Sequence, residues 1–242
     1  MVQLRDALSV SINEDFELIL ASDCSGGIGR KKGDEVQVDP DIVGYFGFRV
    51  AVMECLSAGA RLMAVQLMNF TGDSVWEGYA SGVRMGLKEL DMEDIPLTGS
   101  SESNFNLNQS ALGVTCIGIR RKERRFLPQK DLSYALIGIP LVGKEVLVHR
   151  SSIAPLSLFH TCIHHPSIVD ILPVGSKGVR HELSLLIGKP LKRGDVYSTH
   201  DLDKSSGPAT SFIISYNKEE EQNIRKLTGG HFQSLILFDG NI

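Results

Sequence analysis

Cysteine, long apolar runs and basic clusters are the features in which this 242-residue chain is poor. Its four cysteines are scattered and form no CxxC pair, which argues against a disulfide framework or a zinc knuckle and favours reduced thiols. No apolar run approaches the ~20 residues that a membrane span requires, so a membrane is not an expected partner. The first residues carry acids and no apolar segment, so we expect no signal peptide and a cytoplasmic protein.

Positive charge is also sparse. The formal net charge is -4 at pH 7, and lysines and arginines cluster only in the short stretch 120–125. Nucleic-acid binding would require a broad basic face, so nucleic acid is not an expected partner either. With 42% hydrophobic residues the composition is that of a globular protein, and the length allows one large domain or two small ones.

Apolar periodicity predicts alternating strands and helices over the first half of the chain. Short apolar runs predict strands, whereas apolar residues at helical spacing predict helices. In chain order we expect a strand at 16–23, a helix at 42–60, a strand at 61–70, a helix at 74–92, a short strand at "IPLTG" and a strand at 111–120. The charged, proline-containing segment 121–133 is expected to be a linker.

The second half has the same mixture of elements. In chain order we expect a strand at 134–141, a helix broken near Pro155, a strand, glycine turn and helix over 167–188, a strand at 209–216, a polar helix at "NKEEEQNIRKLTG" and a closing strand at "HFQSLILF". The sequence therefore predicts an α/β (α+β) fold of two halves, residues 1–125 and 126–242.

The stretch "ILASDCSGGIGRKKGD", residues 19–34, is the first candidate site. Asp23 ends an apolar run, where a carboxylate is placed to hold a divalent ion. Lys31 and Lys32 follow and could neutralise phosphate charge. Three glycines allow backbone amides to approach phosphate oxygens without a Cβ in the way: Gly26, Gly27 and Gly29. The alternative is a tight turn whose aspartate caps a backbone amide. Neither a GxxxxGK[ST] loop nor a GxGxxG loop opening a helix is present.

Two further acids stand on or beside predicted core elements. Glu54 lies in an otherwise apolar helix, where a buried acid needs a cation, a metal or a catalytic role. A structural ion pair with Arg49 or Arg61 is an equal alternative. Glu102 lies in "LTGSSESNFN" (97–106), a loop of glycine and hydroxyl residues that would commonly be a plain surface loop.

In the second half, "PVGSKGVRHEL" (173–183) places Gly175, Ser176 and Lys177 before a predicted helix. The N-terminus of such a helix can hold a phosphate, although an ordinary helix start fits equally well. The loop 201–211 offers Asp201 and Asp203 as candidate bases, on its composition alone.

Three histidines cluster in "FHTCIHHPS": His160, His164 and His165. A zinc centre would need further ligands at fixed spacing, and only Cys162 is near. The sequence therefore favours a surface or interface cluster.

The order of the segments "ASDCSGGIG", "AVMECLSAGARLMAVQL", "LTGSSES", "ALGVTCIGI" and "DILPVGSKGVRHEL" resembles the aminoimidazole-ribonucleotide-synthetase-like (PurM-like) ATP-binding superfamily. That group includes thiamine-monophosphate kinase, selenophosphate synthetase and a hydrogenase-maturation enzyme. The resemblance covers nearly the whole chain. It implies an N-terminal mixed sheet with helices, a compact ferredoxin-like C-terminal half, and a homodimer joined through a shared β-barrel.

The resemblance also implies ATP and Mg²⁺ as cofactors. It assigns the metal to Asp23, Glu54 and Glu102, and catalytic roles to Asp23, Lys31 and Lys177. The residues implied to bind the nucleotide are Gly26, Gly27, Gly29, Gly99, Ser100, Ser101, Gly175 and Ser176. Two departures affect the metal: glutamate replaces aspartate in the first helix, and the third loop lacks its usual acid position.

The implied activity is an ATP-dependent kinase that phosphorylates a small nucleoside-like alcohol. An ATP-driven amide or amidine ligase is one alternative, and a nucleotide-binding regulator without catalysis is another. The cysteine or selenocysteine expected near the start of a selenophosphate synthetase is absent, as is the terminal cysteine of the hydrogenase-maturation enzyme.

Overall fold

The computed structural model of the chain describes residues 2–4, 6–122 and 132–238. It divides into two compact units, Met1–Arg124 and Arg125–Ile242. The boundary that the sequence predicts, between residues 125 and 126, lies outside the described residues, as does most of the predicted linker.

The first unit is built on a six-stranded mixed sheet with the order β1-β2-β3-β8-β6-β7. Every neighbouring pair is antiparallel except β6 and β7, which run parallel. The strands are β1 (Val2–Leu4), β2 (Ala7–Ser11), β3 (Phe16–Gly26), β6 (Arg61–Asn69), β7 (Leu97–Ser101) and β8 (Ala111–Arg121). A short parallel pair, β4 (Ile28–Gly29) and β5 (Val36–Gln37), lies in the loop after β3.

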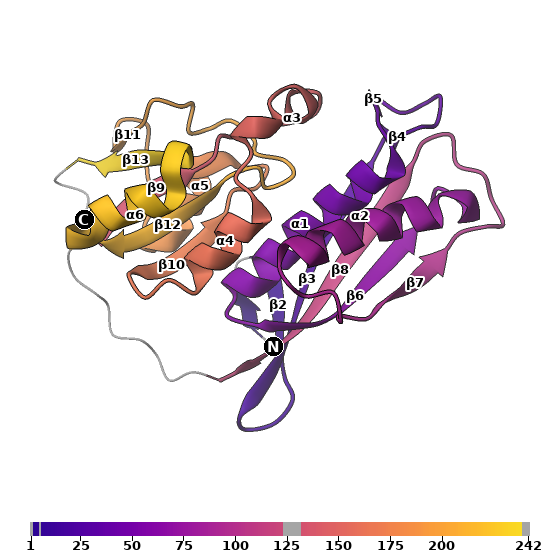
Figure 1. The fold of residues 1–242 in the computed structure, drawn as a ribbon, viewed down its shortest axis with the longest axis horizontal. Helices are drawn as coiled ribbons and strands as arrows, with labels where there is room; N and C mark the ends of the chain where they lie inside the picture. The colour runs from indigo at the N-terminus through magenta and orange to yellow at the C-terminus, as the bar shows by residue number, and fades with distance from the viewer. Residues whose placement is uncertain (1, 5, 123–131, 239–242) are drawn as a thin grey trace. The chain divides into compact units, whose positions relative to one another are not determined.

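Two helices, α1 (Pro40–Ser57) and α2 (Trp76–Glu89), lie side by side on one face of this sheet (Figure 1). Glycines let their backbones touch. A Cβ on Gly82 would lie 2.0 Å from the carbonyl oxygen of Asp41, and one on Gly44 would lie 2.2 Å from that of Tyr79. Larger side chains at these two positions would push the helices apart.

The other face of the sheet carries the alternate side chains of the same strands. Leu18 and Leu20 of β3 lie opposite Ile119 and Ile117 of β8, and all four are half-buried. Further along the same two strands the face becomes polar. This face therefore divides into an apolar part and a hydroxyl-bearing part.

The second unit has a five-stranded antiparallel sheet with the order β10-β12-β9-β13-β11. Its strands are β9 (Leu132–Ile137), β10 (Ile168–Pro173), β11 (Val196–Tyr197), β12 (Phe212–Asn217) and β13 (Phe232–Leu237). Its helices are α3 (Glu145–Val148), α4 (Leu156–Ile163), α5 (Gly178–Ile187) and α6 (Glu221–Thr228).

Helices cover both faces of this second sheet (Figure 1). On one face, Val179 and Leu183 of α5 pack against Leu136 and Ile213 in a buried cluster. Residues that alternate with those positions face α4, where the rings of Phe159 and Phe212 meet edge to face at 5.2 Å. Because both faces are covered, Phe212 to Tyr216 of β12 are all buried, whichever face they point to.

Most predicted elements are confirmed, with boundaries shifted by a few residues. The predicted helix break near Pro155 is real, because that proline separates the short α3 from α4. The sequence interpretation missed the hairpin β1–β2 and the two-residue strands β4, β5 and β11. None of the described helices combines the length and hydropathy needed to cross a membrane.

Candidate functional site

The candidate site lies at the end of the first unit where β3, β6 and β7 finish and β8 begins. Backbone hydrogen bonds hold these strand ends together. The amide of Gly27 donates to the carbonyl of Ser110 at 2.8 Å, and the amide of Glu102 donates to that of Asn69 at 2.7 Å. Segments far apart in the sequence thus meet at one end of the sheet, where these strands terminate.

Asp23 lies on β3, on the face covered by α1. It pairs in register with Val114 of β8, and its Oδ2 lies 3.9 Å from where a Cβ on Gly47 of α1 would stand. Burial raises the pKa of Asp23 to about 6, against a hydrogen bond from the backbone of Cys24 that lowers it. Among the described residues no lysine or arginine acts on this carboxylate. A half-buried acid in this state favours binding a cation.

The residue that holds the glycine loop is Asp34, which the sequence interpretation missed. Its Oδ1 accepts the amide of Ser110 at 2.7 Å, and its Oδ2 accepts the Ser110 hydroxyl at 2.7 Å and the amide of Lys31 at 2.8 Å. Burial opposes ionisation, but these hydrogen bonds outweigh it, so the pKa of Asp34 is lowered. The spacing of 76 residues between Asp34 and Ser110 leaves no local sequence signal.

The three predicted cradle glycines differ in their surroundings. A Cβ on Gly29 would lie 2.4 Å from the hydroxyl oxygen of Ser110, and Gly27, with φ +70°, uses its amide in the bond to Ser110. Gly26 is exposed, and a Cβ there would meet nothing within 4 Å. Two of the glycines therefore serve the packing of the turn, and Gly26 borders open space.

Lys31 ties the same two loops together. Its Nζ donates to the carbonyl of Leu107 at 2.8 Å, next to the bonds that Asp34 makes. The neighbouring Lys32 is exposed. An ammonium group carries three donors, so Lys31 keeps two for another acceptor while it holds the loop.

Glu54 is buried on α1, as predicted, but far along the helix from Asp23. Gly47 is the α1 residue next to Asp23, and Glu54 follows seven residues later, which is about 10 Å along the helix axis. The neighbouring Cys55 lies against Gly118, further down β8.

Glu102 lies just after β7, and its carboxylate shapes its own loop. Its Oε1 accepts the amides of Asn104 at 2.6 Å and Phe105 at 3.3 Å. The residues before it, Gly99 and Ser100, are exposed on the edge strand. Among the described residues, no three histidine, cysteine or acidic side chains come close enough to hold one metal ion. The structure therefore does not bring Asp23, Glu54 and Glu102 together.

A hydroxyl network beneath these loops also escaped the sequence interpretation. The hydroxyl of Thr71 lies 2.7 Å from that of Tyr79 on α2 and accepts the amide of Ala111 at 3.0 Å. Asn69 donates to the Ser101 hydroxyl at 2.9 Å. These polar contacts fix the ends of β6, β7 and β8 against α2.

In the second unit, Gly175, Ser176 and Lys177 form the turn that precedes α5, as predicted. Ser176 and Lys177 are exposed. Gly178 begins the helix with φ +81°, and a Cβ there would lie 2.8 Å from the carbonyl oxygen of Leu202. The amide of Ser206 donates to the carbonyl of Gly175 at 3.1 Å, so the 201–211 loop is fastened to this turn.

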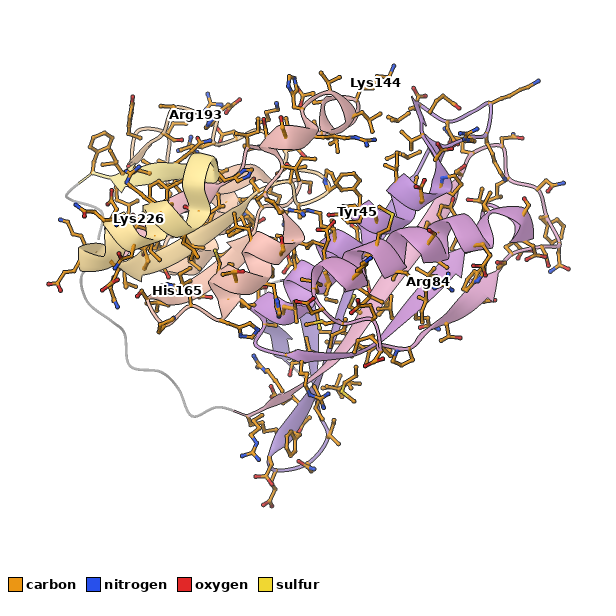
Figure 2. The ribbon with its side chains drawn as sticks, viewed as in Figure 1. Tyr45, Arg84, Lys144, His165, Arg193 and Lys226 are labelled. Atoms are coloured by element: carbon orange, nitrogen blue, oxygen red, sulfur yellow. The ribbon has the colours of Figure 1, made fainter. Side chains whose placement is uncertain are left out.

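The candidate bases in that loop already have partners. Asp203 accepts Nε of Arg180 at 2.8 Å and Nε of Arg193 at 3.0 Å, the latter labelled in Figure 2. The hydrogen bond from Arg180 is the main cause that lowers the pKa of Asp203. Asp201 accepts the amide of Asp203 at 3.0 Å. A carboxylate stabilised in this way is a weak base, which argues against Asp203 in that role.

No protein-family model and no curated protein matches the sequence, but solved structures match the fold. PurL from T. maritima with ADP matches 96% of this chain at 13% identity, with a TM-score of 0.60. Thiamine-monophosphate kinase from Stenotrophomonas maltophilia K279a matches 98% at 13% identity, with a TM-score of 0.54, over 90% of its own chain. A chain of the HypE–HypF complex matches 95% at 11% identity, with a TM-score of 0.59, over 87% of its own chain.

This chain spans 42% of the length of that PurL. At such low identities the likeness shows a shared fold and nothing finer. The mixed α/β architecture expected from the PurM-like resemblance is thereby confirmed.

Proposed function

We propose that this protein is an ATP- and Mg²⁺-dependent small-molecule kinase that phosphorylates a nucleoside-like hydroxyl. The fold it shares with a thiamine-monophosphate kinase and with a PurL solved with ADP supports this proposal. So does the order of sequence motifs that resembles the PurM-like superfamily.

The observation that carries the proposal is the state of Asp23. It is a desolvated carboxylate near the end of the core strand β3, with a pKa raised to about 6, and Gly26, the last residue of that strand, borders open space. Mg²⁺ prefers oxygen ligands and takes only one or two protein carboxylates when phosphate oxygens complete its shell. Asp23 fits that role without a cluster of three acids. The chemistry that Mg²⁺ supplies in such a site is neutralisation of the polyphosphate charge.

The neighbouring residues have separable roles in this proposal. Asp34 and Ser110 hold the loop in place, and Gly26 leaves space beside the backbone for phosphate oxygens. Lys31 and Lys32 bind terminal oxygens. Residues proposed to contact the nucleotide from other segments are Gly99, Ser100, Ser101, Gly175, Ser176 and Lys177. Glu54 and Glu102 lie apart from Asp23 and near opposite ends of β6, so they would share neither the ion at Asp23 nor one second ion.

The acceptor that we propose first is α-ribazole, which would give α-ribazole 5'-phosphate in salvage of the cobamide lower ligand. The versions "SDCSGG" and "LTGSSESNF" of the two loops and the short second half are similar to α-ribazole kinase. The hydroxyl acceptor would attack the γ-phosphorus in line, so positioning supplies most of the catalysis.

We further propose a homodimer through the open face of the first sheet. The half-buried leucines and isoleucines of β3 and β8 on that face support it, because such a surface is stabilised by a second apolar sheet. The order β10-β12-β9-β13 supports a ferredoxin-like second half. Light scattering on the purified chain should give twice the mass of one chain, and a monomeric mass would overturn the dimer.

The kinase proposal is tested by incubating the purified protein with Mg-ATP and a panel of nucleosides that includes α-ribazole. The expected products are ADP and a phosphomonoester, identified by mass spectrometry. The absence of ADP with every member of a broad panel would count against a kinase. An acyl phosphate trapped by hydroxylamine would favour the ligase alternative, and ATP binding without turnover would favour the regulator.

A further inference from the structure

Two histidines at the end of α4 have rings that converge: His160 lies in the last turn, and His164 is the residue that follows the helix. The Nε2 atoms of His160 and His164 are 3.1 Å apart, and the ring planes meet at 82° with centroids separated by 4.7 Å. Residues four apart share one face of a helix. Phe159 and Cys162 are buried on the other side and anchor α4, so the pair is held on a fixed surface turn.

The spacing of these two nitrogens suits a shared metal ion. Metal–imidazole bonds are about 2.0–2.1 Å, so two nitrogens at this separation subtend roughly 95–100° at an ion that both bind. That angle lies between the right angle of tetragonal Cu²⁺ or Ni²⁺ sites and the wider angle of tetrahedral Zn²⁺. Mg²⁺, by contrast, is a hard ion that prefers oxygen.

We propose that His160 and His164 form a bidentate site for a first-row transition-metal ion, with water in its remaining positions. The site is distinct in chemistry and in sequence from the Asp23 region and does not depend on the proposed kinase function.

Two neighbouring side chains of metal-ligand type, Cys162 and His165, have other roles in the structure. Cys162 is buried on the opposite side of α4 from the pair, so its thiol does not face the ion. His165, labelled in Figure 2, accepts the amide of Ser167 at its Nδ1 and so belongs to the turn after α4. No third histidine, cysteine or acid of the described residues joins the pair. Without an ion, a hydrogen bond between the two imidazoles would explain the same distance.

The test uses the untagged full-length chain, because a histidine tag would compete for metal. Calorimetric titration with Cu²⁺, Ni²⁺ and Zn²⁺ should show one ion per chain, and Mg²⁺ should not compete for it. His160→Ala and His164→Ala should each weaken the affinity at least tenfold. His149→Ala, at an exposed histidine elsewhere in the unit, should leave it unchanged.

Electron paramagnetic resonance of the protein with one equivalent of Cu²⁺ gives a second measurement. The wild-type spectrum should show two coordinated imidazole nitrogens, and each single variant should lose one. Thermal unfolding without metal checks that the variants are folded. Wild-type affinity in either variant, or no binding to the wild type, would overturn the site and leave a histidine–histidine hydrogen bond.

Discussion

The carboxylate of Asp34 binds both the amide and the hydroxyl of Ser110, at 2.7 Å each, and so joins the glycine loop to the start of β8. The same carboxylate accepts the amide of Lys31. Both carboxylate oxygens therefore accept hydrogen bonds, and Asp34 is buried. The glycine loop is therefore a structured turn fixed by Asp34, and Asp23 is left for another role.

Asp34→Asn should destabilise the first unit by about 1–3 kcal/mol. The asparagine side chain replaces one of the two carboxylate oxygens with an NH2 group. Whichever way it is turned, this NH2 faces the backbone N–H of Ser110 or of Lys31, and that N–H loses its acceptor. Urea unfolding should show the loss, and hydrogen exchange should quicken over residues 27–36. Glu35→Gln, at the exposed neighbour, is the matched control.

The lowered pKa of Asp34 adds a pH dependence to this comparison. Because the pKa of Asp34 is lower in the folded than in the unfolded state, its carboxylate stabilises the fold at pH values above the unfolded pKa, which is near 4. That stabilisation is lost as the pH falls through the folded-state pKa. Below pH 4 the stability difference between wild type and Asp34→Asn should therefore shrink. A difference that stays constant down to pH 2 would contradict the assignment.

Asp23→Asn should abolish Mg²⁺-dependent ATP turnover and yet stabilise the ligand-free protein at pH 8. The pKa of Asp23 is raised from 3.8 to about 6 in the folded protein. The stabilisation of the fold that comes with protonated Asp23 is therefore complete below pH 4 and is lost as the pH rises through 6. Removing the charge should restore about 1–2 kcal/mol at pH 8, or a few °C in Tm. Near pH 4 the two proteins should unfold alike.

The control for Asp23 is Asp73→Asn, at an exposed acid before α2, which should change neither ATP turnover nor the Tm at pH 8. Full ATP turnover in Asp23→Asn would contradict the proposed metal-binding role and leave this region as a structural turn. An unchanged Tm at pH 8 would show that the carboxylate is solvated in the protein.

Gly26→Ala should separate the proposed phosphate contact from the packing of the turn. A Cβ at Gly26 meets nothing within 4 Å, so the variant should unfold like wild type, but it should raise the KM for ATP several-fold. Gly29→Ala should instead lower stability, because its Cβ would lie 2.4 Å from the Ser110 hydroxyl oxygen. An unchanged KM for ATP in Gly26→Ala would remove Gly26 from the nucleotide site.

Gly82→Ala should destabilise the first unit by about 3 kcal/mol or more, although alanine favours helices. The added Cβ would lie 2.0 Å from the carbonyl oxygen of Asp41 on α1, and backbone on both sides cannot give way. Gly230→Ala, with nothing within 4 Å, is the control and should be neutral. Thermal unfolding of both variants measures the effect. A Gly82→Ala variant as stable as wild type would mean that α1 and α2 are further apart than in the structure.

Several features of this protein could be predicted from the sequence because they depend on neighbours along the chain. Apolar periodicity located the strands that become β3, β6, β8 and β12 and the helix α1, and a proline marked the gap between α3 and α4. The end of an apolar run placed Asp23 at the end of a strand, and the structure continues that strand, β3, for three more residues to Gly26. The edge hairpin β1–β2 and the two-residue strands are too short to show a clear alternation of apolar and polar residues, so they were missed.

The sequence by itself determined the order of helices and strands, the glycine turn after β3 and the presence of acids near core elements. Only the tertiary structure decided which of those acids share a site. Strand order and register bring Asp34 to Ser110 across 76 residues, whereas the rise of α1 carries Glu54 about 10 Å away from Asp23. The physical reason is that contacts across a sheet depend on which strands pair, and local residue patterns do not predict that pairing.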